Sequence, residues 1–210
     1  MNLYLVRHGE SAFNAEGRIQ GQLDTPLSAL GVRQAAAVAE SFRGQPIDAV
    51  YTSPLQRARS TAEPVAALLN LPLRSDPRLM EINAGVFQGL LWPEIHARYP
   101  AAAAAWRGSD PTFRIPEGES RADLMQRAEA ALLAIREAGG EHVIVVAHGG
   151  LLTAGLKALL GIPAQRSPFM LYNGSVSFVE WGVEFKLVTL NQLDHLRASG
   201  HDLRSRTGEL

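Results

Sequence analysis

The stretch Leu3-Tyr4-Leu5-Val6-Arg7-His8-Gly9-Glu10-Ser11 begins with four apolar residues and turns polar at Arg7. The apolar run is too short for a helix and rich in strand formers, so we expect a buried strand that ends at Arg7. Loops at strand ends commonly carry functional side chains. An arginine fork matches two phosphate oxygens, a neutral imidazole is nucleophilic, and a glycine allows close backbone approach. Arg7, His8 and Gly9 therefore predict a phosphate site around a histidine nucleophile.

One tripeptide can arise by chance in a loop, so a second arginine at another strand end is needed as support. Residues 48–52 predict a short strand, and a helix is expected to follow, with Ser53 as its N-cap and Pro54 at its first position. Arg57 then falls in the first helical turn, beside free backbone N–H groups and the positive end of the helix dipole. The alternative, a solvated surface arginine, fits Arg59 better than Arg57.

A third strand end carries a second histidine. The run His142–Ala147 is the strongest strand pattern in the chain, and His148-Gly149-Gly150 separates it from a helical stretch at 151–160. Open α/β sheets bind ligands in the crevice beyond the carboxyl ends of their strands. A lone histidine is more often structural than catalytic, but this position suits packing poorly, and we favour a functional role for His148.

The rest of the chain alternates between helical and strand patterns, which predicts a sheet covered by helices. Apolar residues at helical spacing follow Ser28 and Ser120, and each serine is a plausible N-cap. The expected helices are 29–42 and 121–138, and the expected late strands are 170–172, 175–181 and 184–190.

Composition narrows the functional classes. The 210 residues contain no cysteine, which excludes thiolate-dependent phosphatases, disulfide frameworks and thiolate zinc sites. The six histidines are scattered and show no helical ligand spacing, so we expect no metal and no cofactor. There is also no glycine-rich nucleotide loop that ends in Lys-Ser or Lys-Thr.

Charge and hydropathy limit the partners. The net charge is -1, and Lys157 and Lys186 are the only lysines among 20 basic residues, so we expect no nucleic-acid partner. No stretch is long enough to cross a bilayer, and no secretory segment precedes the first strand, so we expect no membrane partner and a cytoplasmic protein. Small acidic metabolites remain suitable partners through local arginines.

Taken together, the motifs resemble the histidine phosphatase superfamily, also called phosphoglycerate mutase-like. The resemblance covers nearly the whole chain, in matching order and spacing, and rests on Leu5-Val6-Arg7-His8-Gly9-Glu10-Ser11 with Asn14, Ser53-Pro54-Leu55 with Arg57-Ala58, and Ala147-His148-Gly149-Gly150. It implies a three-layer α/β/α sandwich around a mostly parallel sheet, no metal, and a transiently phosphorylated histidine. By this similarity His8 is the phosphoacceptor, and the remaining pocket groups are Arg7, Asn14, Gln20, Gly21, Arg57, His148 and the backbone at Gly149.

The resemblance also assigns the proton donor. Glu81 occupies the position of the family's acid, although the chain has Phe87-Gln88-Gly89 where Trp-Glu-Gly is common in the family. That departure concerns specificity more than catalysis. From the residues alone, Glu81 is equally well an ordinary, partly buried carboxylate that pairs with Arg78.

We expect one domain over residues 1–210, with a small helical cap at about 90–118. The mutases of the superfamily usually carry a longer insertion here with a lysine and an adjacent arginine pair, whereas this segment has no lysine and three separated arginines. The favoured function is therefore a metal-independent phosphomonoesterase for small phosphate esters. A phosphoglycerate mutase and a non-catalytic phosphate-binding domain remain the alternatives, and the resemblance is compatible with a homodimer.

Overall fold

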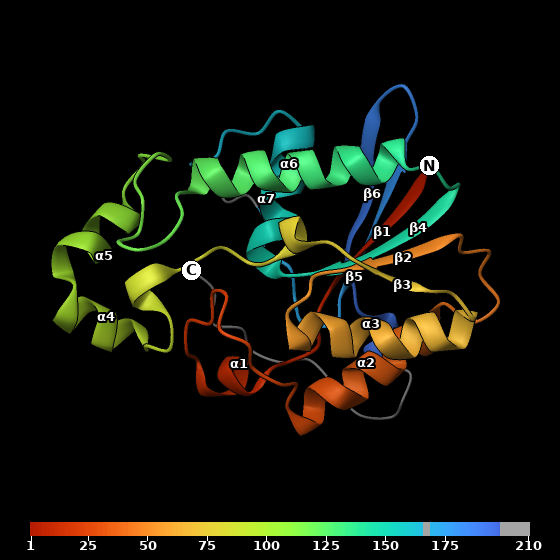
Figure 1. Cartoon of the computed structure of the whole chain (residues 1–210), viewed down its shortest axis with the longest axis horizontal. Coiled ribbons are helices and arrows are strands. Elements are labelled where there is room, and N and C mark those ends of the chain that lie inside the picture. Colours follow the sequence, from red (N-terminus) through yellow and green to blue (C-terminus); the bar gives the residue numbers. More distant parts are fainter. Residues whose placement is uncertain (166–168, 198–210) are drawn as a thin grey trace.

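The computed structural model describes residues 1–165 and 169–197, and its centre is one six-stranded sheet (Figure 1). The strand order is β3-β2-β4-β1-β5-β6. The first four strands in this order run parallel to one another, and β5 and β6 extend the sheet as an antiparallel pair. The strands are β1 (Asn2–Arg7), β2 (Ala49–Thr52), β3 (Leu73–Ser75), β4 (His142–Ala147), β5 (Val176–Trp181) and β6 (Phe185–Gln192).

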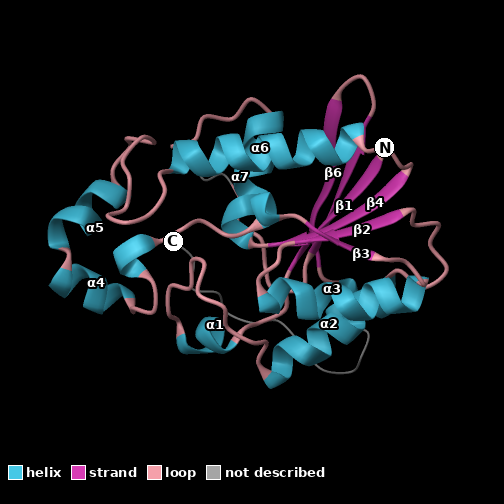
Figure 2. Ribbon diagram, viewed as in Figure 1, coloured by secondary structure: helices cyan, strands magenta, loops and turns pink. Residues whose placement is uncertain are grey.

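Helices cover both faces of this sheet (Figure 2). The pair α2 and α3 packs on one face and the pair α6 and α7 on the other, while α4 and α5 lie beyond one end of the sheet. This arrangement confirms the expected α/β class with a mostly parallel sheet. The helices are α1 (Ala12–Glu16), α2 (Ala29–Ser41), α3 (Gln56–Leu69), α4 (Trp92–Arg98), α5 (Pro100–Arg107), α6 (Arg121–Glu137), α7 (Gly149–Leu159) and α8 (Asp194–Arg197), with short 3-10 turns η1 (Pro77–Leu79) and η2 (Gly85–Phe87).

The core has two halves, one on each face of the sheet, because side chains alternate along a strand. In β1, Leu3 and Leu5 are buried among residues of α6 and α7, whereas Val6 packs among residues of α2 and α3. Burial on both faces explains the nearly continuous apolar sequence of β1 and of β4.

The parallel pairing places three strand ends side by side at one edge of the sheet. Arg7 lies opposite Ala147, and Thr52 lies opposite Val146. The residues that follow these ends are His8, Ser53 and His148. The fold thus brings together three segments that are far apart in the sequence.

Two local expectations were wrong. Helix α3 begins at Gln56 with Leu55 as its N-cap, so Ser53 is not the N-cap and Pro54 is not the first helical residue. The Ser53 hydroxyl lies 2.8 Å from Nε2 of the His148 ring and accepts from the Leu55 N–H at 3.3 Å. Residues 170–172 form no strand and connect directly to the turn before β5.

Candidate active site

His8 lies directly after β1 and is almost completely buried. Its backbone N–H donates to the Ala147 carbonyl of the neighbouring strand, at 2.9 Å. The ring atom Nδ1 lies 2.6 Å from the Gly9 carbonyl oxygen, which can only accept a hydrogen bond. Nδ1 therefore carries the proton, and the lone pair is on Nε2.

The surroundings keep this imidazole neutral. Burial lowers the pKa of His8 well below its usual value, and the positive charges of Arg57 and Arg7 lower it further. Burial is the larger of these causes, and the two arginines add to it. A neutral ring with a free Nε2 lone pair is the nucleophilic form of histidine.

Arg57 approaches the same place from the first turn of α3. Its guanidinium donates through Nη1 to the Leu23 carbonyl and through Nη2 to the Gly21 carbonyl, both at 2.8 Å. Burial lowers the pKa of Arg57 to about 10, so the group remains a cation at neutral pH. The left-handed backbone of Gly21, with φ of 55°, aims its carbonyl at this arginine, and a Cβ there would collide with Gln88 and Ala84.

Three buried donors or acceptors beside His8 have no hydrogen-bond partner within residues 1–165 and 169–197. They are Asn14 Nδ2, Arg57 Nε and His148 Nδ1. Asn14 uses its Oδ1 to accept from Ser11 and Asn173, which leaves its Nδ2 as a donor. Buried polar atoms are rarely left unpaired in a folded protein, so this cluster suits a ligand rich in acceptor oxygens.

His148 lies at the N-terminus of α7, next to His8. The two imidazole rings are 5.1 Å apart between centroids. The Nε2 atom of His148 lies 2.8 Å from the Ser53 hydroxyl. Burial and the neighbouring positive charges lower the pKa of His148 well below its usual value.

Glu81 caps the N-terminus of α7. Its two carboxylate oxygens accept from the backbone N–H groups of Gly150 and Leu151, each at 3.0 Å. Gly150 must be a glycine for this contact, because a Cβ there would lie 2.5 Å from Glu81 Oε1. The alternative pairing with Arg78 is wrong, since Arg78 forms its ion pair with Asp76 at 2.7 Å.

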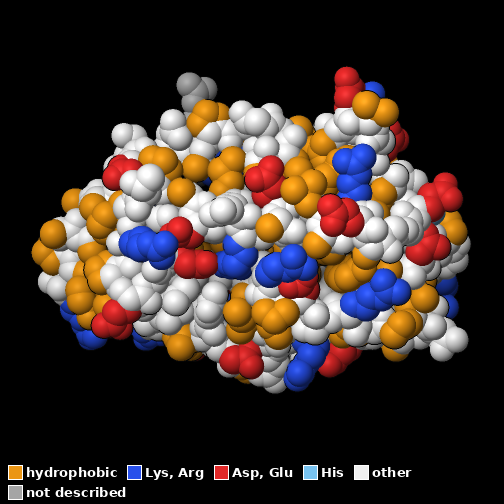
Figure 3. Space-filling view, turned by 45° about the horizontal axis from the view of Figure 1, so that its top comes forward, with side chains coloured by type: hydrophobic (Ala, Val, Ile, Leu, Met, Phe, Trp, Pro, Cys, Tyr) orange, Lys and Arg blue, Asp and Glu red, His pale blue; other side chains and the backbone are white. Residues whose placement is uncertain are grey.

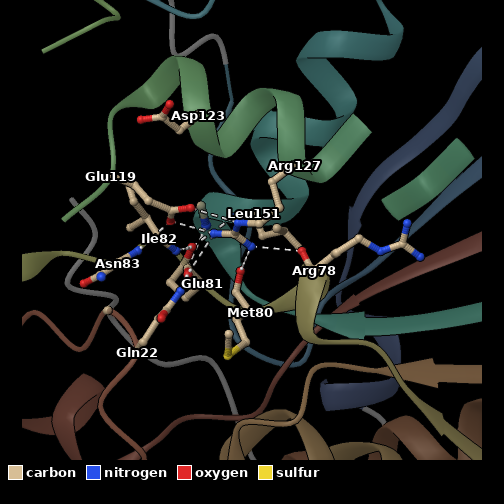
Figure 4. A network of polar contacts seen from close by, with 12 residues as sticks. Gln22, Arg78, Met80, Glu81, Ile82, Asn83, Glu119, Asp123, Arg127 and Leu151 are labelled. Carbon is tan, nitrogen blue, oxygen red and sulfur yellow. Dashed lines mark hydrogen bonds and ion pairs between the residues drawn. The ribbon is translucent and has the colours of Figure 1, made fainter. Parts of the chain in front are cut away.

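Arg127 holds the backbone around Glu81 in place (Figure 4). From α6 its guanidinium donates to the carbonyl oxygens of Arg78, Met80 and Glu81, at 2.6 to 3.2 Å. It also pairs with Glu119 at 2.7 Å, and Glu119 accepts from the Asn83 backbone. Sequence analysis missed Arg127, because a single polar residue on an amphipathic helix gives no sign of distant carbonyl partners.

These groups line one cavity of about 470 Å³, the size of a small-metabolite site. Every residue that the sequence placed in the site lines it except His148, which lies buried against His8. Sequence analysis missed several further lining residues, including Trp106, Arg121 and Lys157. A signal for Lys157 existed, because Gly149, Thr153 and Lys157 recur at intervals of four and share one face of α7.

Comparison with known proteins agrees with this geometry. The model of the histidine phosphatase superfamily (branch 1) matches residues 3–192. This chain belongs to that superfamily. The expected resemblance is therefore confirmed at the level of the family.

Relatives within the superfamily carry both mutase and phosphatase names. A protein of Yersinia pestis named probable phosphoglycerate mutase is 40% identical over 187 residues, which cover 86% of this chain and 85% of the relative. The solved mycobacterial glucosyl-3-phosphoglycerate phosphatase is 35% identical, with a TM-score of 0.79 and coverage of 90% and 98%. A putative alpha-ribazole-5'-P phosphatase from Escherichia coli is 29% identical, with a TM-score of 0.86 and coverage of 91% and 96%. Family and neighbours together support a phosphatase.

The described part of this superfamily member has no helix long and apolar enough to span a membrane. Within the same residues no group of three or more histidine, aspartate or glutamate side chains is arranged to hold a metal ion. On the face shown in Figure 3, basic and acidic side chains are interspersed.

The buried neutral His8 makes the fold sensitive to mild acid. Because folding lowers the pKa of His8, the unfolded chain takes up a proton below about pH 6.5 that the folded protein does not. The free energy of unfolding therefore keeps its full contribution from the neutral His8 above about pH 6.5 and loses it as the pH falls. The slope approaches about 1.4 kcal/mol per pH unit for one histidine. Urea unfolding of the wild type and of His8→Asn between about pH 5.5 and 7.5 measures it. The variant should show the shallower decline in acid, and equal slopes would contradict a neutral His8.

Proposed function

We propose that this protein is a metal-independent phosphomonoesterase that hydrolyses small phosphorylated metabolites through a phosphohistidine at His8. The observation that carries the proposal is the buried, neutral His8 with its lone pair on Nε2, next to two arginines and unpaired polar atoms of Asn14 and His148. Phosphoryl transfer needs a nucleophile, compensation of charge on the equatorial oxygens and a proton for the leaving group. The pocket offers a candidate for each of these three roles.

In the first step, the Nε2 lone pair of His8 attacks phosphorus and the bond from phosphorus to the ester oxygen breaks. Arg7, Arg57 and Asn14 donate to the equatorial oxygens, and His148 donates from Nδ1 when Ser53 donates its hydroxyl proton to Nε2. The leaving alkoxide takes a proton from Glu81, which acts as the general acid. Alcohol and phosphohistidine are the products of this step.

In the second step, water attacks the phosphohistidine. The Glu81 carboxylate accepts a proton from this water as the new bond from oxygen to phosphorus forms and the bond to Nε2 breaks. Inorganic phosphate leaves, and His8 returns to its neutral form. Glu81 thus serves as acid and then as base, and general acid–base catalysis of this kind typically contributes about 10²- to 10⁴-fold in rate.

A phosphoglycerate mutase is the second candidate, and the name of the 40% identical relative favours it. A mutase must retain the alcohol and exclude water between its two transfers. The segment 90–118 is short and carries three separated arginines and no lysine, which suits release of the alcohol better than its retention. The phosphatase names of two solved neighbours agree with hydrolysis.

Product analysis separates the two activities. Incubated with 3-phosphoglycerate and without added metal, the protein should release inorganic phosphate and form little 2-phosphoglycerate. Molybdate detection of phosphate, with chromatography of the remaining ester, measures both products in one sample. A product mixture dominated by 2-phosphoglycerate would assign the protein to the mutases.

His8→Ala should abolish turnover of p-nitrophenyl phosphate, because the described residues that line the pocket include no other imidazole. Vanadate or phosphate should still bind this variant, since the arginines remain, and isothermal calorimetry measures this binding. Rapid quenching of the wild type in alkali should trap an acid-labile phosphate on His8, located by mass spectrometry. Turnover of the wild type and of His8→Ala is measured in the presence of EDTA. Turnover that persists in His8→Ala, or wild-type turnover that is lost in EDTA, would contradict the scheme.

Glu81→Gln should slow esters of poor leaving groups far more than aryl esters, because a phenolate departs with little protonation. We expect a loss of about 10²-fold or more in kcat for glycerol 3-phosphate and a smaller loss for p-nitrophenyl phosphate. Glu63→Gln is the control, since Glu63 is an exposed carboxylate on α3 that pairs with Arg59 and lies outside the pocket. Equal slowing of both substrates in Glu81→Gln would show that Glu81 is not the proton donor.

A further inference from the structure

The pocket has a second group of cationic side chains, away from His8. Arg121 lies in the first turn of α6 and Lys157 in the last turn of α7, and both line the cavity together with Trp106. The helices α6 and α7 pack against each other. Neither cation has a part in the phosphoryl transfer described above.

Arg121 is held in a fixed position without an acidic partner. Its guanidinium stacks over the Trp106 ring, 3.9 Å from the centroid, and donates through Nη2 to the Trp106 carbonyl at 2.6 Å. No carboxylate within residues 1–165 and 169–197 pairs with it. The charge is therefore positioned by an aromatic ring and a neutral carbonyl, and it remains available to an anion.

Lys157 is buried next to this arginine. Its Nζ donates to the Ala164 carbonyl at 2.9 Å. Burial lowers the pKa of Lys157, and the positive charge of Arg121 lowers it further, so the two cations are close enough to repel each other. Two like charges at one end of a partly closed cavity are stabilised when an anion lies between them.

The charges that line the cavity do not balance. Among its lining residues within the described part of the chain, Arg7, Arg57, Arg121 and Lys157 are cationic, and Glu81 is the one carboxylate. A phosphate dianion bound at His8 offsets two of these four positive charges, and Glu81 offsets at most one. At least one positive unit therefore remains, at the end of the pocket where Arg121 and Lys157 lie.

We propose that the substrate is a phosphate monoester with a second anionic group, a carboxylate, which Arg121 and Lys157 bind. This inference rests on the proposed function and adds the class of substrate to it. The apolar side chains of Ile82, Leu124 and Ala154 line the same cavity and suit a short carbon skeleton. The indole Nε1 of Trp106, which is buried and has no hydrogen-bond partner in the described residues, supplies a further donor for the carboxylate.

Two matched pairs of esters test this proposal. 3-Phosphoglycerate differs from glycerol 3-phosphate by one carboxylate in place of a hydroxymethyl group, and 6-phosphogluconate differs in the same way from glucitol 6-phosphate. We expect kcat/KM of the wild type to be about 10-fold or more higher for at least one acid than for its neutral partner. In Arg121→Gln this preference should fall by about 10-fold, mainly through KM, and Arg121→Lys should restore part of it.

Arg136 provides the matched control on the same helix. It also stacks on a tryptophan, Trp181, and donates to a backbone carbonyl, that of Gly182, but it lies outside the cavity. Arg136→Gln should keep the acid preference of the wild type. If Arg121→Gln fails to fold, as judged by its melting temperature, the same esters are compared with Lys157→Met instead.

Equal kcat/KM for both members of each pair in the wild type would overturn the inference. An equal decrease in kcat/KM for the acid and the neutral esters in a folded Arg121→Gln variant would also overturn it. Neither result affects the proposed function, which is judged separately by His8-dependent turnover of p-nitrophenyl phosphate. Absence of that turnover would instead remove the proposed function, and this inference with it.

Discussion

The parallel register between β1, β4 and β2 is the constraint on which the site depends. Arg7 lies opposite Ala147 and Thr52 lies opposite Val146, so three chain segments leave the sheet at the same edge. A slip of one residue would move every side chain of a strand to the other face. Because both faces of β1 are buried in separate halves of the core, such a slip would also place its apolar residues wrongly. The packing that stabilises the sheet thereby fixes the position of His8 beside His148.

The site concentrates positive charge where the protein cannot solvate it well. Arg57 is almost fully buried, and burial lowers its pKa and the pKa values of His8 and His148. Neutral histidines limit the repulsion, while backbone carbonyls of Gly21 and Leu23 hold the arginine. An anion that enters replaces this unfavourable arrangement with charge-assisted hydrogen bonds. The same positive charges that favour an anion thus keep His8 neutral.

The sequence predicted the parts of the site that depend on local patterns. His8, Arg57 and His148 each follow a short apolar run, and such runs identify buried strands. Glu81 was ambiguous from the residues alone, because its partners, Gly150 and Leu151, lie 69 and 70 positions further along the chain. The capping role assigned to Ser53 was wrong for a similar reason, since its hydroxyl contacts a histidine 95 residues away. Arg121 and Arg127 were missed because helical periodicity places them on a helix but says nothing of what lies opposite.

The two ends of the pocket are formed by different parts of the fold. This difference affects the balance between hydrolysis of a phosphohistidine and transfer of its phosphoryl group back to the alcohol. The end near His8 is formed by residues at the ends of β1 and β4 and by Arg57 of α3, whereas the far end is formed by side chains of α6, α7 and the segment 90–118. Cations that hold a carboxylate of the substrate also slow departure of the alcohol product. An alcohol that stays bound can take the phosphoryl group back from the histidine. In the proposed scheme, hydrolysis requires water to reach Glu81 before that return. Glu81 contacts Gly150 and Leu151 in the first turn of α7, whereas Lys157 lies in the last turn of the same helix. The balance between the two reactions therefore depends on how tightly the far end holds its anion, while the chemistry at His8 remains the same.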